Sequence, residues 1–336
     1  MEARQVEALP TGPGWQFEPK WDGFRCLAGR HGTKVELLGR SGKSLARYFP
    51  EVVAALGALG PRRFVLDGEL VIPVGKELSF EALQMRLHPA ASRIRRLAEE
   101  TPAVLIAFDL LEDADGKDLR TAPLSERRTR LASFFRRVGK ASGLRLSPAT
   151  TRRSEAVKWV ARAGGGELDG VVAKELDRPY LGGERAMLKI KNLRTADCVV
   201  GGFRYATGSR EVGSLLLGLF NEAGLLDHVG FTSGLAALDR TALTKRLEKL
   251  KGGGFTGDAP GGPSRWSTER SSQWVPVKPR LVAEVRYDHV TGRRFRHGTG
   301  FVRWRPDKAP RDCAFDQLVR EARYPLFFAS TPARPV

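Results

Sequence analysis

The sequence predicts an α+β protein of two domains, in which a larger domain of strands and helices precedes a small β-barrel. At 336 residues the chain is long enough for two separate cores, and its hydrophobic fraction of 41% is ordinary for a folded protein. Up to about residue 191, apolar strand patterns alternate with amphipathic helix patterns. From residue 195 the pattern changes to short strands and glycine-rich turns. We therefore expect a first domain over residues 1–193, a second over residues 194–336, and a hinge near residues 192–195.

The elements of the first domain follow from hydrophobic periodicity, which has a period of two in strands and 3.6 in helices. We predict a helix over residues 125–138 with Ser125 as its N-cap. A helical pattern over residues 80–97 should break near His88 and Pro89, because proline lacks a backbone N–H group. The other expected helices cover residues 49–59 and 154–163, and the expected strands cover residues 15–17, 24–27, 35–38, 63–72, 104–111, 167–174 after an initial turn, and 188–191.

The second domain should contain five short strands and one helix. This combination suits a small Greek-key barrel such as the OB-fold. The expected strands cover residues 198–204, 214–220, 226–232, 281–287 and 301–305, the helix covers residues 237–251, a loop rich in glycine, proline and serine covers residues 252–264, and residues 332–336 form a loose tail.

The net charge of +18 indicates a polyanionic partner. Basic residues outnumber acidic residues in both predicted domains, as expected if both contact one phosphate backbone; a merely soluble basic surface is the alternative. Cys26, Cys198 and Cys313 lie far apart, which argues against a structural zinc site or a disulfide framework. The sequence has no apolar run near 18 residues and no secretory signal, so we expect a cytoplasmic protein without a membrane span.

One stretch, Glu-Pro-Lys-Trp-Asp-Gly-Phe-Arg at residues 18–25, places a lysine beside an acid, a glycine and an arginine. A free lysine has a pKa of about 10.4, so it becomes a useful nucleophile only through burial or a nearby cation. Taken alone, the stretch is more typical of a strand end followed by an Asp-Gly turn. A second stretch resembles a phosphate loop, but only Gly39 and Gly42 precede Lys43, so the P-loop pattern fails.

The order and spacing of several motifs are more informative than any one of them. In chain order they are Lys-x-Asp-Gly-x-Arg (20–25), Asp-Gly-Glu (67–69), Phe-Asp-Leu-Leu (108–111), Asp-Gly-Val-Val-Ala-Lys (169–174) and Lys-x-Lys (189–191), just before the predicted barrel. This series resembles the covalent nucleotidyltransferases, meaning DNA ligases and mRNA capping enzymes. Residues 303–308, Arg-Trp-Arg-Pro-Asp-Lys, resemble the last ligase motif.

With residues 274–277 and 295–298, the chain looks most like the minimal bacterial ATP-dependent ligases of the ligase C type. These are related to the ligase domain of ligase D in end joining. The resemblance runs from about residue 15 to residue 318. It implies a nucleotidyltransferase (adenylation) domain of antiparallel sheets with flanking helices, followed by an OB-fold domain.

The resemblance also implies a reaction. Lys20 would attack the α-phosphorus of ATP, release pyrophosphate and become a lysyl-AMP, which then adenylates a DNA 5′-end before sealing. Lys189 and Lys191, on one strand face, would stabilise the charge that develops on the phosphoryl oxygens and favour the neutral amine of Lys20. Asp307 and Lys308 would reach the pyrophosphate when the second domain closes.

Five further residues would contact ATP or AMP by the same resemblance. Phe108 would stack on the adenine, with burial in the core as its alternative. Glu69 would accept hydrogen bonds from the ribose hydroxyls, and Arg25 would contact the ribose or a phosphate. Glu18 and Lys174 would lie in the nucleotide site, with Lys174 near the adenine or the phosphates.

The expected metal is Mg²⁺ or Mn²⁺, inferred from the phosphate chemistry. Asp169 and Glu69 are the expected ligands. Most ligases carry glutamate where this chain has Asp169, and Glu167 is the alternative ligand.

The expected substrate is nicked or broken duplex DNA, bound by a monomer that works with end-joining or repair proteins. Arg40 would bind the 5′-phosphate of the nick, because a planar guanidinium suits an oxyanion. Phe295, Arg303 and Trp304 would pack on sugar and phosphate, or else the two aromatic residues belong to the barrel core. Two other functions remain open from the sequence: a capping-type guanylyltransferase or RNA ligase, and a non-catalytic OB-fold DNA-binding protein.

Overall fold

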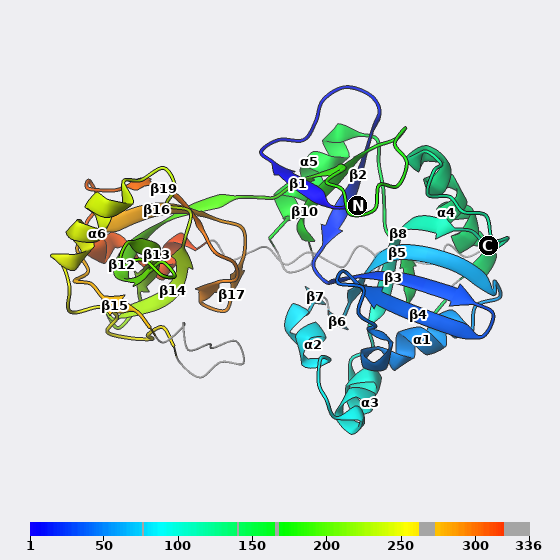
Figure 1. The fold of residues 1–336 in the computed structure, drawn as a ribbon, viewed down its shortest axis with the longest axis horizontal. Helices are drawn as coiled ribbons and strands as arrows, with labels where there is room; N and C mark the ends of the chain where they lie inside the picture. Colours follow the sequence, from blue (N-terminus) through cyan, green and yellow to red (C-terminus); the bar gives the residue numbers. More distant parts are fainter. Residues whose placement is uncertain (76, 140, 165–167, 262–272, 319–336) are drawn as a thin grey trace. The chain divides into compact units, whose positions relative to one another are not determined.

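The computed structural model describes residues 1–75, 77–139, 141–164, 168–261 and 273–318. The described residues divide into two compact units, the first ending at Asn192 and the second starting at Leu193. Figure 1 shows their elements, and each unit is described by itself.

The first unit is built on two sheets. The four-stranded sheet has the order β1-β11-β10-β2, and the five-stranded sheet has the order β4-β3-β5-β8-β9. Neighbours pair antiparallel except for β1 with β11 and β8 with β9. The strands are β1 (Ala3–Val6), β2 (Trp15–Trp21), β3 (Phe24–His31), β4 (Lys34–Gly39), β5 (Arg63–Val71), β8 (Val104–Glu112), β9 (Leu144–Leu146), β10 (Leu168–Glu175) and β11 (Met187–Ile190), with a separate pair β6 (Pro73–Val74) and β7 (Glu77–Leu78).

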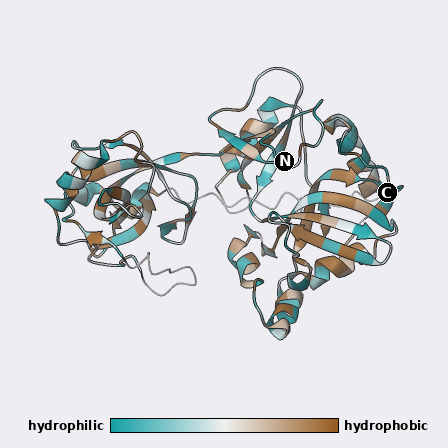
Figure 2. Cartoon of the chain, in the orientation of Figure 1, coloured by the Kyte–Doolittle hydropathy of each residue, from teal (hydrophilic) through white to brown (hydrophobic). Residues whose placement is uncertain are grey.

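The two sheets share a hydrophobic core. Phe17 and Trp21 of β2 belong to one buried cluster with Val71 of β5 and Ile106 of β8. A second cluster lies between the five-stranded sheet and its helices, where Phe134 of α4 packs edge-on against Phe64 of β5. In Figure 2 the hydrophobic colour concentrates on the strands, as expected for sheets that are covered by other elements.

The helices of this unit are α1 (Pro50–Gly57), α2 (Phe80–Met85), α3 (Ala91–Glu100), α4 (Leu124–Val138) and α5 (Arg153–Arg162). The predicted break near His88 and Pro89 is confirmed, because both residues lie between α2 and α3.

The prediction that Ser125 caps α4 is wrong, because α4 begins one residue earlier and Pro123 is its N-cap. Backbone carbonyls satisfy the first amides of the helix in place of a side chain. The Leu124 amide donates to the Arg178 carbonyl (3.0 Å) and the Ser125 amide to the Leu176 carbonyl (2.9 Å).

The second unit is a curled antiparallel sheet of the order β14-β13-β12-β16-β19, with β15 paired to β12. Its edges meet where Thr232, at the end of β14, bridges Thr299 beside β19. The strands are β12 (Arg194–Tyr205), β13 (Val212–Phe220), β14 (Leu226–Thr232), β15 (Val275–Pro276), β16 (Val282–Tyr287) and β19 (Gly300–Trp304), with a hairpin of β17 (Val290–Thr291) and β18 (Arg294–Phe295).

Helix α6 (Arg240–Glu248) is shorter than the predicted 237–251, and the Asp239 side chain accepts a hydrogen bond from the Ala242 amide at its start. The predicted loop over 252–264 is described only to residue 261, and the tail at 332–336 lies outside the described residues. The α+β fold with an OB-like second unit is confirmed.

The barrel core contains one residue that was expected to pack against DNA. Phe295 is 7% exposed and lies against Tyr287, with ring centroids 4.8 Å apart. For Phe295 the core alternative is therefore the right one. Trp304 is partly buried against Phe301, and Arg303 pairs with Glu284 on the surface.

Candidate active site

Residues 18–25 join the two sheets of the first unit. Lys20 lies within β2 of the four-stranded sheet, and Arg25 lies within β3 of the five-stranded sheet. The chain crosses from one sheet to the other at Asp22 and Gly23, so this Asp-Gly pair connects two sheets. A Cβ at Gly23 would lie 2.2 Å from the Leu70 carbonyl oxygen, so only glycine fits this close to β5.

Asp169 binds two of the three predicted catalytic lysines. Its Oδ2 lies 2.5 Å from Lys20 Nζ, and its Oδ1 lies 2.9 Å from Lys191 Nζ. The pairing of β10 with β2 shifts at Asp169, which is the extra residue of a β-bulge rather than part of the predicted turn. A bulge changes the direction of a side chain, and here it brings the carboxylate to both amines. Gly170 has a φ of 150°, and a Cβ there would lie 2.1 Å from the Ile190 carbonyl oxygen.

The lysines make this end of the sheet positive. Burial alone would raise the pKa of Asp169, but Lys20 and Lys191 outweigh it and hold that pKa below its ordinary value. Burial lowers the pKa of Lys189, and repulsion from Lys191 and Lys20 adds to the effect. Arg40 contributes in the same direction. Three amines around one carboxylate can bind a polyphosphate and stabilise charge that develops on its oxygens.

Glu69 on β5 is the second candidate metal ligand. Burial raises its pKa to about 8, against the opposing effect of Lys20 and Arg25. Among the residues that the structure describes, no three His, Cys, Asp or Glu side chains form a ready metal site, and Glu167 lies outside those residues. Two carboxylates still fit Mg²⁺, which is commonly held by one or two carboxylates together with substrate phosphates.

Arg25 is held by Asp67, the first residue of the Asp-Gly-Glu motif, for which the sequence predicts no role of its own. Its Nε and Nη2 donate to the two oxygens of Asp67, at 3.0 and 2.6 Å, and Asp67 is fully buried. The hydroxyl of Tyr180 donates to the same carboxylate at 2.8 Å. Arg25 also lies over the ring of Phe108, 5.5 Å from its centroid.

Phe108 is partly exposed and belongs to none of the hydrophobic clusters found among the described residues, unlike Ala107 and Leu110 of the same strand. Lys174 Nζ lies 4.6 Å from the ring centroid and 2.7 Å from Glu18 Oε2. The other carboxylate oxygen of Glu18 accepts from Gln16 at 2.6 Å. The structure thus brings Glu18, Lys174 and Phe108 into one group, with both Glu18 oxygens bonded within the protein.

A buried ion pair supports this group from behind. Arg127, with no exposed surface, donates to both oxygens of Asp109 at 2.8 and 3.0 Å and also to the Arg178 carbonyl. It lies over the ring of Tyr180 at 5.8 Å. Asp67 and Asp109 could have been noticed in the sequence, because a carboxylate inside an apolar strand needs a buried partner. Nothing in the sequence pattern identifies the partners.

Three predicted site residues remain. Arg40 acts on the pKa of Lys189 from the surface, where its side chain is 76% exposed and pairs with Glu2. Asp307 and Lys308 belong to the second unit and are described with it below.

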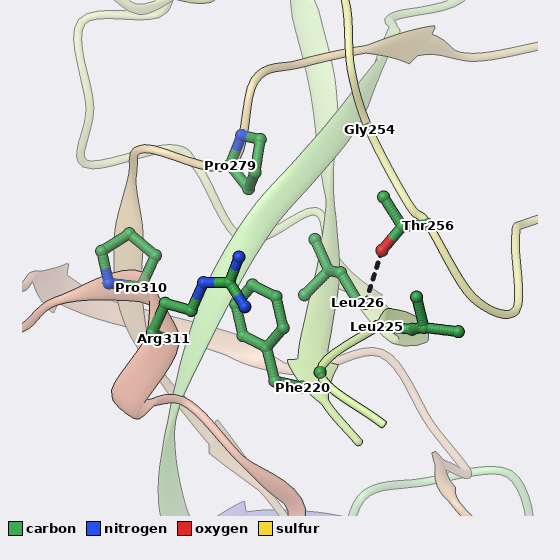
Figure 3. A pocket seen from close by; sticks show the side chains of 9 residues that line it. Phe220, Leu225, Leu226, Gly254, Thr256, Pro279, Pro310 and Arg311 are labelled. Atoms are coloured by element: carbon green, nitrogen blue, oxygen red, sulfur yellow. Dashed lines mark hydrogen bonds between the residues drawn. The ribbon is translucent and has the colours of Figure 1, made fainter. Parts of the chain in front are cut away.

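A cavity of about 430 Å³ lies on the barrel of the second unit. Figure 3 shows Arg311 and Phe220 on one side and Thr256 on the other, where its hydroxyl accepts from the Leu226 amide. Its described lining is mostly apolar and includes no lysine or carboxylate, so it does not offer the chemistry found around Lys20.

Comparisons with known proteins identify the family. The model "ATP dependent DNA ligase domain" matches residues 3–191, and "ATP dependent DNA ligase C terminal region" matches residues 208–308. DNA ligase C2 of Mycolicibacterium smegmatis is 45% identical over 334 residues, covering 95% of this chain and 93% of that protein. The multifunctional non-homologous end joining protein LigD of Mycobacterium bovis is 30% identical over 312 residues, covering 91% of this chain but 37% of LigD. A solved Lig E DNA ligase shares the fold with a TM-score of 0.56 at 18% identity, covering 91% of this chain and all of that one.

The first unit has two sheets with Lys20 at their junction, and the second unit is an OB-like barrel. These are the two parts of a nucleotidyltransferase of the ligase class. The chain belongs to the family of ATP-dependent DNA ligases and is of the ligase C type. It is therefore an enzyme that uses ATP to seal nicks in duplex DNA, and the capping-enzyme and non-catalytic alternatives are not supported. No helix among the described residues is long and apolar enough to cross a membrane.

Proposed function

We infer that Lys20 is the nucleophile of this ligase. Its amine attacks the α-phosphorus of ATP, the new N–P bond forms as the bond to pyrophosphate breaks, and lysyl-AMP results. The AMP then passes to the 5′-phosphate of a nick, and the 3′-hydroxyl attacks that phosphate to release AMP. The observation that supports this assignment is that one carboxylate contacts two lysines. Asp169 lies 2.5 Å from Lys20 Nζ and 2.9 Å from Lys191 Nζ.

Asp169 holds the amine of Lys20 before the reaction. An ammonium group in an ion pair has no lone pair, so the contact with Asp169 must open before Lys20 attacks. Lys191 already holds the other oxygen of Asp169 and can keep the carboxylate in place. Lys189 and Lys191 then stabilise the negative charge on the α-phosphate as the bond to pyrophosphate breaks.

Asp169 and Glu69 are the residues that would hold Mg²⁺ or Mn²⁺. The metal would neutralise phosphate charge during the transfer. Glu69 lies one strand from Arg25, since Glu69 and Arg25 are paired residues of β5 and β3. This position also suits Glu69 to accept a hydrogen bond from a ribose hydroxyl.

The adenosine site is assigned to the group around Phe108. Its ring is partly exposed and offers a face for adenine, while Lys174 and Glu18 form a fixed polar edge beside it. Arg25, held by Asp67, is assigned to the ribose or a phosphate. Arg40, exposed on the turn after β4, is assigned to the 5′-phosphate of the nick.

The second unit supplies Asp307 and Lys308 for the pyrophosphate. We take residues 1–193 as the adenylation domain and residues 194–336 as the OB-fold domain, joined by a hinge that lets the second domain approach ATP and then DNA. The net charge of +18 suits binding of a duplex by both.

The biological setting is DNA repair or end joining in the bacterial cytoplasm, by a monomer that meets other repair proteins at the break. The name of the related LigD, a non-homologous end joining protein, supports this setting.

The test is transfer of labelled AMP from ATP to the protein in the presence of Mg²⁺. Lys20→Ala is expected to abolish the label. Lys43→Ala is the matched control, because Lys43 is an exposed lysine in a glycine-containing turn of the same unit and should keep full labelling. Full labelling of Lys20→Ala would overturn the assignment of the nucleophile.

A further inference from the structure

Asp197 lies on β12 and binds the last ligase motif of the chain. Its two oxygens accept from Arg305 Nη1 at 3.0 and 2.9 Å, and Oδ2 also lies 3.1 Å from Lys308 Nζ. Only 8% of Asp197 is exposed. This carboxylate therefore fixes two cations of residues 303–308 at once.

Arg305 extends the contact to the neighbouring acid. Its Nη2 and Nε donate to Asp307 at 2.8 and 3.0 Å, while Nη1 is bonded to Asp197. The planar guanidinium thus spans two carboxylates, which restricts its rotation. Asp197 and Arg305 together determine where Asp307 and Lys308 lie on the barrel.

The backbone of Asp197 is fixed as well. Its amide donates to Gln317 Oε1 at 2.8 Å, and Gln317 Nε2 donates to its carbonyl at 3.0 Å. A carboxylate that is fixed at both the backbone and the side chain is suited to positioning other groups.

The net charge of the cluster around Asp197 indicates how it could act on a triphosphate. Arg305 and Lys308 carry two positive charges, and Asp197 and Asp307 carry two negative charges, so the four groups sum to zero. Such a cluster attracts a triphosphate weakly over distance. Its value lies in holding Lys308 and Arg305 in one geometry, which lowers the cost of orienting them when the reaction occurs.

We propose that Asp197 is a positioning residue for adenylation of Lys20, acting by fixing Lys308 directly and Asp307 through Arg305, the two residues assigned to the departing pyrophosphate. The inference rests on the proposed function. Asp197 does not touch the nucleotide, and it acts in the first step of the reaction only. Sealing of a nick that already carries AMP on its 5′-end needs no pyrophosphate contact and therefore no Asp197.

The test uses Asp197→Asn in the full chain, with single-turnover transfer of labelled AMP from ATP. We expect the maximal rate to fall on the order of tenfold or more, because the two cations lose their common anchor. The concentration of ATP at half-maximal rate should stay the same or fall, because removing a negative charge makes the cluster more attractive to ATP. A merely structural defect would not produce this split.

A second substrate measures the folded fraction in the same preparation. Sealing of a pre-adenylated nicked duplex should change less than twofold in Asp197→Asn, so the ratio of the two rates reports on the first step even if part of the protein is unfolded. Asp227→Asn is the matched control, since Asp227 is another carboxylate of the barrel with 6% exposure and bonds to Asn221 and the Asp258 amide. That variant should leave the ratio unchanged.

Three outcomes would overturn the inference: an unchanged rate of AMP transfer in Asp197→Asn, an equal loss in both steps, or an equal change of the ratio in Asp227→Asn. These outcomes are separate from failure of the proposed function, which shows instead as unlabelled wild-type protein or as label that survives Lys20→Ala.

Discussion

Lys20 Nζ and Asp169 Oδ2 lie 2.5 Å apart, so the assigned nucleophile and an assigned metal ligand are bonded to each other. The contact holds the amine near the place where it must react, and it must open before the amine can attack. A metal ion held by Asp169, as proposed above, would compete with Lys20 for this carboxylate.

The first prediction concerns this contact. Asp169→Asn should slow AMP transfer to Lys20 by about 10²-fold or more, because it removes a metal ligand and an anchor for two lysines. Asp169→Glu should retain most of the activity, since it keeps a carboxylate for the two lysines. The measurement is the single-turnover labelling rate over a series of Mg²⁺ concentrations. Asp118→Asn serves as control, because Asp118 pairs with Arg120 on the surface. A wild-type labelling rate in Asp169→Asn would show that Asp169 has no role in AMP transfer.

The second prediction concerns the β-bulge that sets the direction of the Asp169 side chain. Gly170→Ala should lower the free energy of unfolding by about 2–4 kcal/mol. Gly170 has a φ of 150°, and a Cβ there would lie 2.1 Å from the Ile190 carbonyl oxygen. Gly32→Ala, with a φ of 64° and open space around the Cβ position, should cost only about 1 kcal/mol. Urea unfolding of both variants measures the difference. Equal costs would show that the bulge can relax around a side chain.

Periodicity was enough to predict most strands and helices and the change to short strands and glycine-rich turns after residue 191. It also predicted that Lys189 and Lys191 lie on one face of a strand. It was not enough for the Asp-Gly pairs. Asp22 and Gly23 form a crossing between sheets, and Asp169 is a bulge residue; both depend on strand register, which a local pattern does not contain. Partners such as Tyr180 and Asp67, which are 113 residues apart, are brought together only by the tertiary fold.

The third prediction concerns Tyr180. Its hydroxyl donates to Asp67 at 2.8 Å and accepts from Arg25 Nη2 at 3.5 Å. Tyr180→Phe removes both contacts while keeping the ring against Arg127. The expected loss is about 1 kcal/mol, or roughly fivefold, in the half-saturating ATP concentration for AMP transfer. Tyr48→Phe is the control, as its ring is partly buried beside Arg47, an exposed residue. If both variants bind ATP like the wild type, the hydroxyl has no part in positioning Arg25.

The fourth prediction concerns the pH dependence of stability that Glu69 causes. Its pKa is about 8 in the folded protein and about 4.5 when exposed, so between these values the folded state binds a proton that the unfolded state lacks. The stability from this group is complete below about pH 4.5 and is lost as the pH rises through 8. In urea unfolding with EDTA present, wild-type protein should therefore lose more stability between pH 5 and 9 than Glu69→Gln, which cannot titrate. Glu99→Gln, at an exposed position on α3, should follow the wild-type curve. Parallel curves for wild type and Glu69→Gln would mean that Glu69 is ionised throughout this range and is ready to bind a metal ion without first losing a proton.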